Sequence, residues 1–270
     1  MHKRNIIVIG GSAGAVQPVT ELLRALPEGF PAALFVALHF SPLSDEWLSS
    51  HLRKTVRLPV RSPRGDLEIR DGQIIVARPD HHLIVQQGKV LSSCGPRENM
   101  WRPAIDVLFR TAAVTYGSRV IGVLMSGELD DGTAGLQAIK QCGGLAVVQS
   151  PEDAIHPAMP RTATANVDVD HTASLSELPD LLFRLVEQAA PAGIPIPEYL
   201  KKEASMALAA EDSGAWMQQQ GPPSPLSCPE CSGPLWQSGP HGAQFRCMVG
   251  HAFHMNALMQ GADEEIDRTL

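Results

Sequence analysis

The sequence has no long apolar run, no excess of basic residues and no secretion signal. Its longest apolar stretches, such as Ala32 to Leu38, are far shorter than the about 20 residues that cross a bilayer, which argues against membrane insertion. The net charge of −7 argues against nucleic acid as the main partner, because phosphate backbones attract basic surfaces. The run from Ile6 to Ile9 is too short for the apolar core of a signal peptide. A cytoplasmic location is therefore expected.

Cysteine is also scarce, with five residues in 270. Cys94 and Cys142 stand alone and are expected to be inert, because an isolated cysteine behaves as a small apolar residue. An odd count without a secretion signal does not indicate a disulfide framework. The other three cysteines cluster near the C-terminus at metal-ligand spacing.

Residues 5 to 190 alternate short apolar runs with longer amphipathic stretches, a pattern that predicts an α/β fold with a doubly wound, mainly parallel, Rossmann-like sheet. The expected buried strands are Ile6 to Ile9, Ala32 to Leu38, Val120 to Met125 and Leu145 to Gln149. Between residues 58 and 92 the apolar period changes to two. There Gln73 to Ala77, Leu83 to Val85 and Val90 to Leu91 are predicted to form small antiparallel strands with one hairpin.

Composition divides the chain into three parts. We expect a main domain over residues 1–190 and a linker over 191–225 that contains a helix from Tyr199 to Glu211. A compact Cys/His unit is expected over 226–260.

Three polar residues follow the ends of predicted parallel strands. Ser12 lies in the glycine-rich turn after the first strand, His39 directly follows the second, and Asp131 lies a few residues beyond the Val120 strand. Ligands of open α/β sheets bind at such strand ends. A serine hydroxyl becomes a nucleophile when a histidine accepts its proton and a carboxylate orients that histidine. The sequence thus predicts a serine hydrolase with Ser12, His39 and Asp131 as its catalytic residues and no cofactor for catalysis.

Each residue also has a purely structural interpretation. Ser12 could only cap the helix that follows it, His39 could be a hydrogen-bonded structural histidine, and Asp131 could cap the helix from Thr133 to Gln141. A dinucleotide site fits poorly, because Ser12 replaces the second glycine of the G-x-G-x-x-G pattern and His39 stands where a ribose-binding acid is expected.

Several ordered motifs over residues 5 to 190 resemble the catalytic domain of the chemotaxis protein-glutamate methylesterases, the CheB family. The motifs are Val8 to Gly14, Leu38 to Phe40, Ala77 to Leu83, Arg102 to Arg110, Met125 to Gly135 and Met159-Pro160.

The resemblance implies hydrolysis of glutamate γ-methyl esters on the cytoplasmic helices of chemoreceptors, and also deamidation of receptor glutamine. It assigns nucleophile, base and orienting acid to Ser12, His39 and Asp131, and places one oxyanion-binding N–H group at Glu128. Two positions depart from the family pattern: Ala13 replaces a frequent threonine, and Glu128-Leu129 replace a common Met-Gly.

The sequence starts at the catalytic strand, so we expect a stand-alone form without a receiver domain. Its partner would be a methylated chemoreceptor or another methylated signalling protein. The alternative is a catalytically inactive methylesterase-like module that binds within a signalling complex.

The C-terminal unit presents Cys228, Cys231, Cys247 and His251 in the spacing C-x2-C, fifteen residues, C-x3-H. This pattern predicts a closed tetrahedral zinc site, with His254 or His241 as rival fourth ligands. So short a segment would depend on the metal for folding. We expect the unit to dock a protein partner, and we expect metal removal to leave the hydrolase largely intact.

Overall fold

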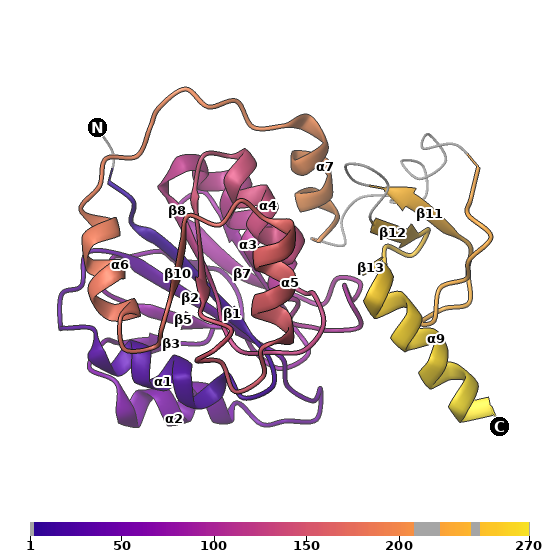
Figure 1. Ribbon diagram of the computed structural model, residues 1–270, viewed down its shortest axis with the longest axis horizontal. Helices are drawn as coiled ribbons and strands as arrows, with labels where there is room; N and C mark the ends of the chain where they lie inside the picture. The colour runs from indigo at the N-terminus through magenta and orange to yellow at the C-terminus, as the bar shows by residue number, and fades with distance from the viewer. Residues whose placement is uncertain (1–2, 208–221, 239–243, 270) are drawn as a thin grey trace.

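A seven-stranded sheet forms the centre of the computed structural model (Figure 1). The structure describes residues 3–207, 222–238 and 244–269. The sheet contains, in spatial order, β10 (His171–Ala173), β9 (Leu145–Gln149), β8 (Val120–Leu124), β1 (Ile6–Gly11), β2 (Ala33–Leu38), β5 (Ile74–Val76) and β3 (Val60–Arg61). All neighbouring pairs are parallel. The predicted doubly wound, mainly parallel sheet is therefore confirmed.

Helices cover both faces of the sheet, which explains why its central strands are continuously apolar. The first face carries α1 (Val16–Ala25), α2 (Trp47–Thr55) and α6 (Leu178–Val186), and the second carries α3 (Ile105–Tyr116), α4 (Thr133–Gln141) and α5 (Ala158–Asn166) (Figure 1). Alternate residues of β1 serve the two cores: Ile7 and Ile9 pack toward the first face, and Ile6 and Val8 toward the second. All four are at most 1% exposed.

A small antiparallel sheet joins the second face. It consists of β4 (Leu67–Glu68), β7 (Lys89–Ser93) and β6 (His82–Gln86), and β6 and β7 form the predicted hairpin. The prediction that Gln73 to Ala77 belongs to this antiparallel group is wrong. Strand β5 is buried along its whole length and pairs in parallel with β2. Its apolar residues are better buried there, between two helix-covered faces, than at a small sheet's edge.

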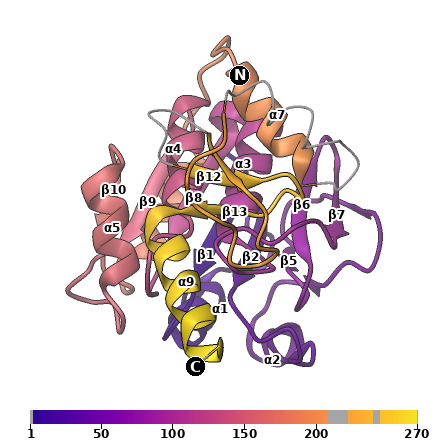
Figure 2. The same cartoon turned by 90° about the vertical axis from the view of Figure 1, so that its right-hand side faces the viewer.

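The C-terminal unit is a three-stranded antiparallel sheet followed by a helix. Its elements are β11 (Leu235–Ser238), β12 (Gln244–Cys247), β13 (Ala252–His254) and α9 (Met255–Thr269). Seen from its own side, the unit lies in front of the central strands (Figure 2). Helix α7 (Glu198–Met206) falls within the helix predicted from Tyr199 to Glu211, whose part beyond residue 207 is outside the described residues. In the parts of the chain that the structure describes, no helix combines the length and apolarity needed to cross a membrane.

Candidate active site

The site lies where the strand order of the main sheet reverses. Strand β1 has β2 on one side and β8 on the other, so the chain leaves the centre in both directions. Such a switch point opens a crevice at the carboxyl ends of the strands. The segments after β1, β2 and β8 carry Ser12, His39 and Asp131, which the sheet therefore brings to one edge.

The three side chains form a continuous hydrogen-bonded chain. His39 Nδ1 is 3.1 Å from Ser12 Oγ, and His39 Nε2 is 2.7 Å from Asp131 Oδ2. The side chains of His39 and Asp131 are each 3% exposed, so little water competes for this hydrogen bond. With Nε2–H donated to Asp131, the imidazole presents a lone pair at Nδ1 to the serine hydroxyl. This geometry suits proton transfer from Ser12 to His39.

Neither Ser12 nor Asp131 caps the helix that follows it in the sequence. Helix α1 begins after Ala15 without a side-chain cap, and the Ser12 amide donates to Ser126 O at 2.9 Å. The main chain thus fixes Ser12 and leaves its hydroxyl to His39. Helix α4 begins after Gly132, and Asp131 makes no capping hydrogen bond to it.

Asp131 instead binds the amino end of another helix, α3. Its Oδ2 accepts from the Ile105 amide at 2.7 Å, and its Oδ1 accepts from the Asp106 amide at 3.1 Å. Burial opposes ionisation, but the hydrogen bond and charge of His39, followed by the Ile105 amide, hold the pKa of Asp131 well below its usual range. Asp131 is therefore a carboxylate at neutral pH, as an orienting acid requires.

Three residues that the sequence did not single out surround this chain. Trp101 stacks on His39 with ring centroids 4.5 Å apart and planes 9° from parallel. Asn99 Nδ2 donates to Asp131 Oδ1 at 3.0 Å and to Asp106 Oδ2 at 3.0 Å. Asp106 in turn caps α4, because its Oδ1 accepts from the Gly132 and Gly135 amides. Asp106 lies within a motif of the resemblance, but no local pattern marks Asn99 or Trp101.

Gly127 holds the loop after β8 close to the candidate nucleophile. A Cβ atom placed on Gly127 would lie 3.1 Å from Ser12 Cβ and 2.7 Å from Met159 Sδ. The Gly127 amide donates to His156 O at 3.0 Å. The side chain of the next residue, Glu128, turns to the same partner and accepts from His156 Nδ1 at 2.7 Å. The Gly127–Glu128 main chain is therefore packed beside Ser12.

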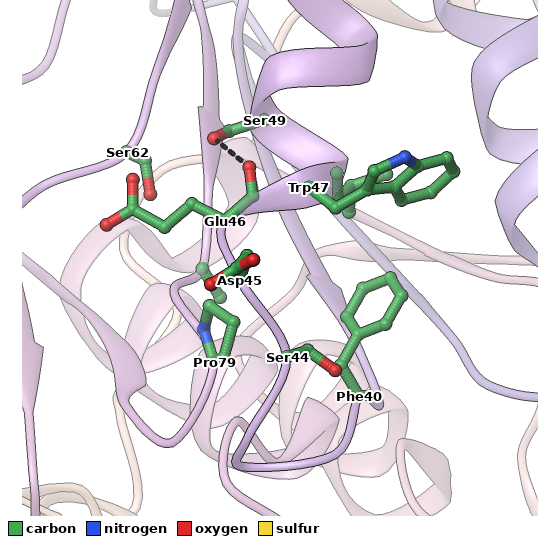
Figure 3. Close-up of a pocket in the computed structure, with 10 residues that line it drawn as sticks. Phe40, Ser44, Asp45, Glu46, Trp47, Ser49, Ser62 and Pro79 are labelled. Carbon is green, nitrogen blue, oxygen red and sulfur yellow. Dashed lines mark hydrogen bonds between the residues drawn. The ribbon is translucent and has the colours of Figure 1, made fainter.

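A cavity of about 200 Å³ is lined by Phe40, the residue after His39, and by residues 44–49 of the same segment. Figure 3 shows the aromatic rings of Phe40 and Trp47 on one side of it and the carboxylates of Asp45 and Glu46 on the other. Ion pairs of Glu46 with Arg64 and Arg78, both 3.0 Å long, offset part of this negative charge. The cavity is thus an amphipathic recess in the segment that follows His39.

The four predicted metal ligands of the C-terminal unit come together. The ligand atoms of Cys228, Cys231, Cys247 and His251 all lie within 4.8 Å of one another. The Sγ atoms of Cys231 and Cys247 are 3.7 Å apart, and Cys247 Sγ is 3.5 Å from His251 Nδ1. Zinc–sulfur bonds of about 2.3 Å in a tetrahedron place their ends about 3.8 Å apart. The cluster therefore fits a tetrahedral zinc ion.

Neither rival ligand is found in the cluster of described residues. His254 donates from Nε2 to Asp106 Oδ2 at 3.0 Å and is not part of the cluster. His241 lies outside the described residues.

A doubly wound sheet with a hydroxyl, an imidazole and a carboxylate linked at its switch point is an arrangement typical of α/β serine hydrolases. Comparison with known proteins narrows this class. The family model "CheB methylesterase" matches residues 7–182. The chain belongs to the CheB methylesterase family.

Similar proteins agree with this family. A putative protein-glutamate methylesterase/protein-glutamine glutaminase of Leptospira interrogans is 40% identical over 181 residues, which cover 66% of this chain and 93% of that protein. A protein-glutamate methylesterase/protein-glutamine glutaminase of Methanosarcina acetivorans is 31% identical over 191 residues, 68% of this chain and 54% of that protein. The CheB methylesterase catalytic domain of Thermotoga maritima superposes with a TM-score of 0.64 at 30% identity, covering 69% of this chain and all of that structure.

Proposed function

We propose that the chain is a serine hydrolase that removes methyl esters from glutamate side chains of chemoreceptor-type proteins in the cytoplasm. The observation that carries the proposal is the unbroken chain of hydrogen bonds from Ser12 through His39 to Asp131. The names of the relatives, protein-glutamate methylesterase/protein-glutamine glutaminase, support the choice of ester and of protein substrate.

The reaction uses each group in turn. Ser12 Oγ attacks the ester carbonyl carbon while its proton passes to His39 Nδ1. The tetrahedral intermediate collapses, the methoxy oxygen takes the proton from His39, and methanol leaves an acyl ester on Ser12. Water then attacks this ester while His39 accepts its proton. The second tetrahedral intermediate collapses as His39 returns that proton to Ser12 Oγ, and the free glutamate side chain leaves and ionises to its carboxylate. Asp131 keeps the imidazole in the required tautomer and offsets its positive charge. With glutamine as substrate, ammonia replaces methanol as the leaving group.

The oxyanion of the intermediate needs N–H donors that are in place before the reaction. We assign one of them to the Glu128 main chain, since Gly127 packs directly against Ser12. Among the described residues, the Glu128 amide makes no hydrogen bond to another group, so it is free to donate.

The Gly127→Ala variant tests this assignment. The added Cβ would collide with Ser12 and Met159 and push the oxyanion donor out of position. We expect kcat on a methyl ester to fall by on the order of 100-fold, the effect of a misplacement of about 1 Å. Gly65→Ala is the matched control, because a Cβ there meets nothing within 4 Å. Equal kcat values for the two variants would remove the Gly127–Glu128 main chain from the mechanism.

Two exposed apolar side chains near the site support a protein substrate. Leu43 is 95% exposed and Trp47 is 53% exposed, and both belong to the segment that follows His39. Exposed apolar side chains in the segment after the candidate base suit docking of a polypeptide better than capture of a small soluble ester. A methylated receptor helix would present both the ester and an apolar flank.

The Cys/His cluster is proposed to hold a structural zinc ion through Cys228, Cys231, Cys247 and His251. When bound, zinc would supply folding free energy to a segment whose own core is small. No catalytic step is assigned to it, because all four ligand positions are taken by the protein.

The function is tested by measuring methanol released from a receptor fragment with methyl-esterified glutamates. We expect release with saturation kinetics by the wild type and none above background by Ser12→Ala. A chromogenic small ester serves as the comparison substrate. Fast turnover of the small ester with no methanol from the receptor fragment would point to a small-ester hydrolase. Tight binding of the fragment without methanol release would identify an inactive binding module.

A further inference from the structure

The C-terminal unit does not extend freely from the main domain but pairs with its loop at Glu98 and contacts Asp106 through His254. We propose that Asn99 and His254 are positioning residues for Asp131, and that the Cys/His unit, which carries His254, is therefore a working part of the esterase. This inference rests on the proposed function of Ser12, His39 and Asp131.

The first step is the bridge that Asn99 makes between two buried acids. Its side-chain Nδ2 lies 3.0 Å from Asp131 Oδ1 and 3.0 Å from Asp106 Oδ2, and the residue is only 4% exposed. Its backbone is in the left-handed region with φ at 51°, a conformation that asparagine adopts more readily than most residues. Asn99 thus holds the face of Asp131 that does not meet His39.

The second step is the set of hydrogen bonds between the C-terminal unit and Asn99. The Asn99 amide donates to Ala252 O at 2.7 Å, and Asn99 Oδ1 accepts from the His254 amide at 2.9 Å. The Ala252 amide donates in turn to Arg97 O at 3.2 Å. Strand β13 is therefore paired with the loop from Arg97 to Asn99. The main-chain amide and the side-chain oxygen of Asn99 therefore both have their partners in the C-terminal unit, while its side-chain nitrogen binds the two acids.

The third step is charge. Burial and the neighbouring Asp131 carboxylate raise the pKa of Asp106, because two like charges share a small apolar space. His254 donates to Asp106 Oδ2 at 3.0 Å. Burial alone would lower the pKa of His254, but its hydrogen bond to Asp106, with the charges of Asp106, Asp130 and Asp131, raises it to about 9. The imidazolium offsets the second carboxylate and leaves the charge of Asp131 to His39.

A buried ionic bridge fastens the unit next to this network. Glu98 Oε1 accepts from Arg110 of α3 at 2.7 Å and from Arg246 of β12 at 3.2 Å. All three side chains are between 2% and 5% exposed. Arg246 directly precedes the ligand Cys247, so the metal cluster and the bridge are held by adjacent residues of one strand. A metal that fixes the position of the cluster would therefore also fix Arg246 and β13. Both contact the loop from Arg97 to Asn99, whose Asn99 binds Asp131.

The position of Trp101 adds a second path to the same loop. Trp101 stacks on His39 and exchanges main-chain hydrogen bonds with Glu98. The loop gripped by the C-terminal unit therefore touches both the base and the acid of the triad. In contrast to the expectation from the sequence, we therefore expect metal removal to lower the esterase activity.

The test compares His254→Ala, His254→Gln and Asn99→Ala with the control Met259→Ala, whose residue is on the same unit and 60% exposed. Activity is measured on a small chromogenic ester, zinc per chain by metal analysis, and the His39 Nε2–H proton by its downfield NMR resonance. We expect kcat to fall by on the order of 100-fold in His254→Ala and Asn99→Ala with KM nearly unchanged, and the resonance to shift or broaden. His254→Gln, which can still donate to Asp106, should recover part of the loss. Met259→Ala should match the wild type.

Unchanged kcat and an unchanged resonance in His254→Ala and Asn99→Ala, with zinc bound, would overturn the proposal. A second experiment uses the wild-type protein and so does not depend on the variants folding. Chelation should lower kcat at the rate at which zinc is released and disturb the His39 resonance, and added zinc should restore both. Full loss of zinc with kcat and resonance intact would also refute it. Failure of the proposed function is distinguishable, because then the wild type itself would lack esterase activity or Ser12→Ala would retain it.

Discussion

Replacing Ser12 by alanine is expected to lower kcat for methyl ester hydrolysis by on the order of 10⁶-fold. The variant keeps the oxyanion donors and the imidazole, but it has no atom to form the acyl intermediate, so only slow direct attack by water remains. Folding should be unaffected, because the main chain of Ser12 is fixed by its bond to Ser126 O and not by its hydroxyl. The kcat on a methylated receptor fragment and the melting temperature are the quantities to measure.

Ser44→Ala is the matched control for this experiment. Ser44 also follows β2 and lines the cavity of that segment, but among the residues that the structure describes it makes no hydrogen bond to Ser12, His39 or Asp131. It should retain wild-type kcat. If Ser12→Ala and Ser44→Ala released methanol at the same rate, Ser12 would not be the nucleophile.

Replacing Asp131 by asparagine is expected to lower kcat by about 10⁴-fold. The carboxylate accepts hydrogen bonds from His39, Asn99, and the amides of Ile105 and Asp106. An asparagine has one acceptor oxygen, so its NH₂ group must face either His39 or the other donors. Facing His39, it forces the proton onto Nδ1, which then cannot accept the serine proton. The kcat on a small ester measures the effect, with Asp168→Asn, whose side chain is 99% exposed, as the control.

The same substitution should show in the pH dependence of stability. The pKa of Asp131 is lowered on folding, so its contribution to stability is present above its ordinary pKa near 4 and is lost as the pH falls toward the folded value. The wild type should therefore melt well above Asp131→Asn at neutral pH, and the gap should narrow in acid. A gap that widens in acid would mean that Asp131 is buried as the neutral acid.

Much of the main sheet could be predicted because its apolar runs are long enough to be buried on both faces. The three candidate residues were found for a related reason: the carboxyl ends of neighbouring parallel strands meet at one edge, so position in the sequence indicated position in space. Strand β5 was misplaced because Ile74 to Val76 is too short for its period to distinguish a parallel partner from an antiparallel one.

The rest of the site depends on contacts between distant segments that leave no local pattern. Asn99 belongs to a loop, and its role follows from β13, more than 150 residues away in the sequence. The sequence presents His254 only as a rival metal ligand. The carboxylates also cap helices other than their neighbours in the sequence: Asp131 accepts from an amide at the start of α3, and Asp106 accepts from an amide at the start of α4. A carboxylate near a helix start is expected to cap that helix, and only the packing of α3 against α4 reverses this.

The central claim is that Ser12, His39 and Asp131 act as one unit, and the kcat of the double variant Ser12→Ala/His39→Ala tests it most directly. Groups that act together in one proton transfer are not additive, so the double variant should be no slower than Ser12→Ala alone. If the two losses multiplied instead, the serine and the histidine would serve separate steps and the account would be wrong.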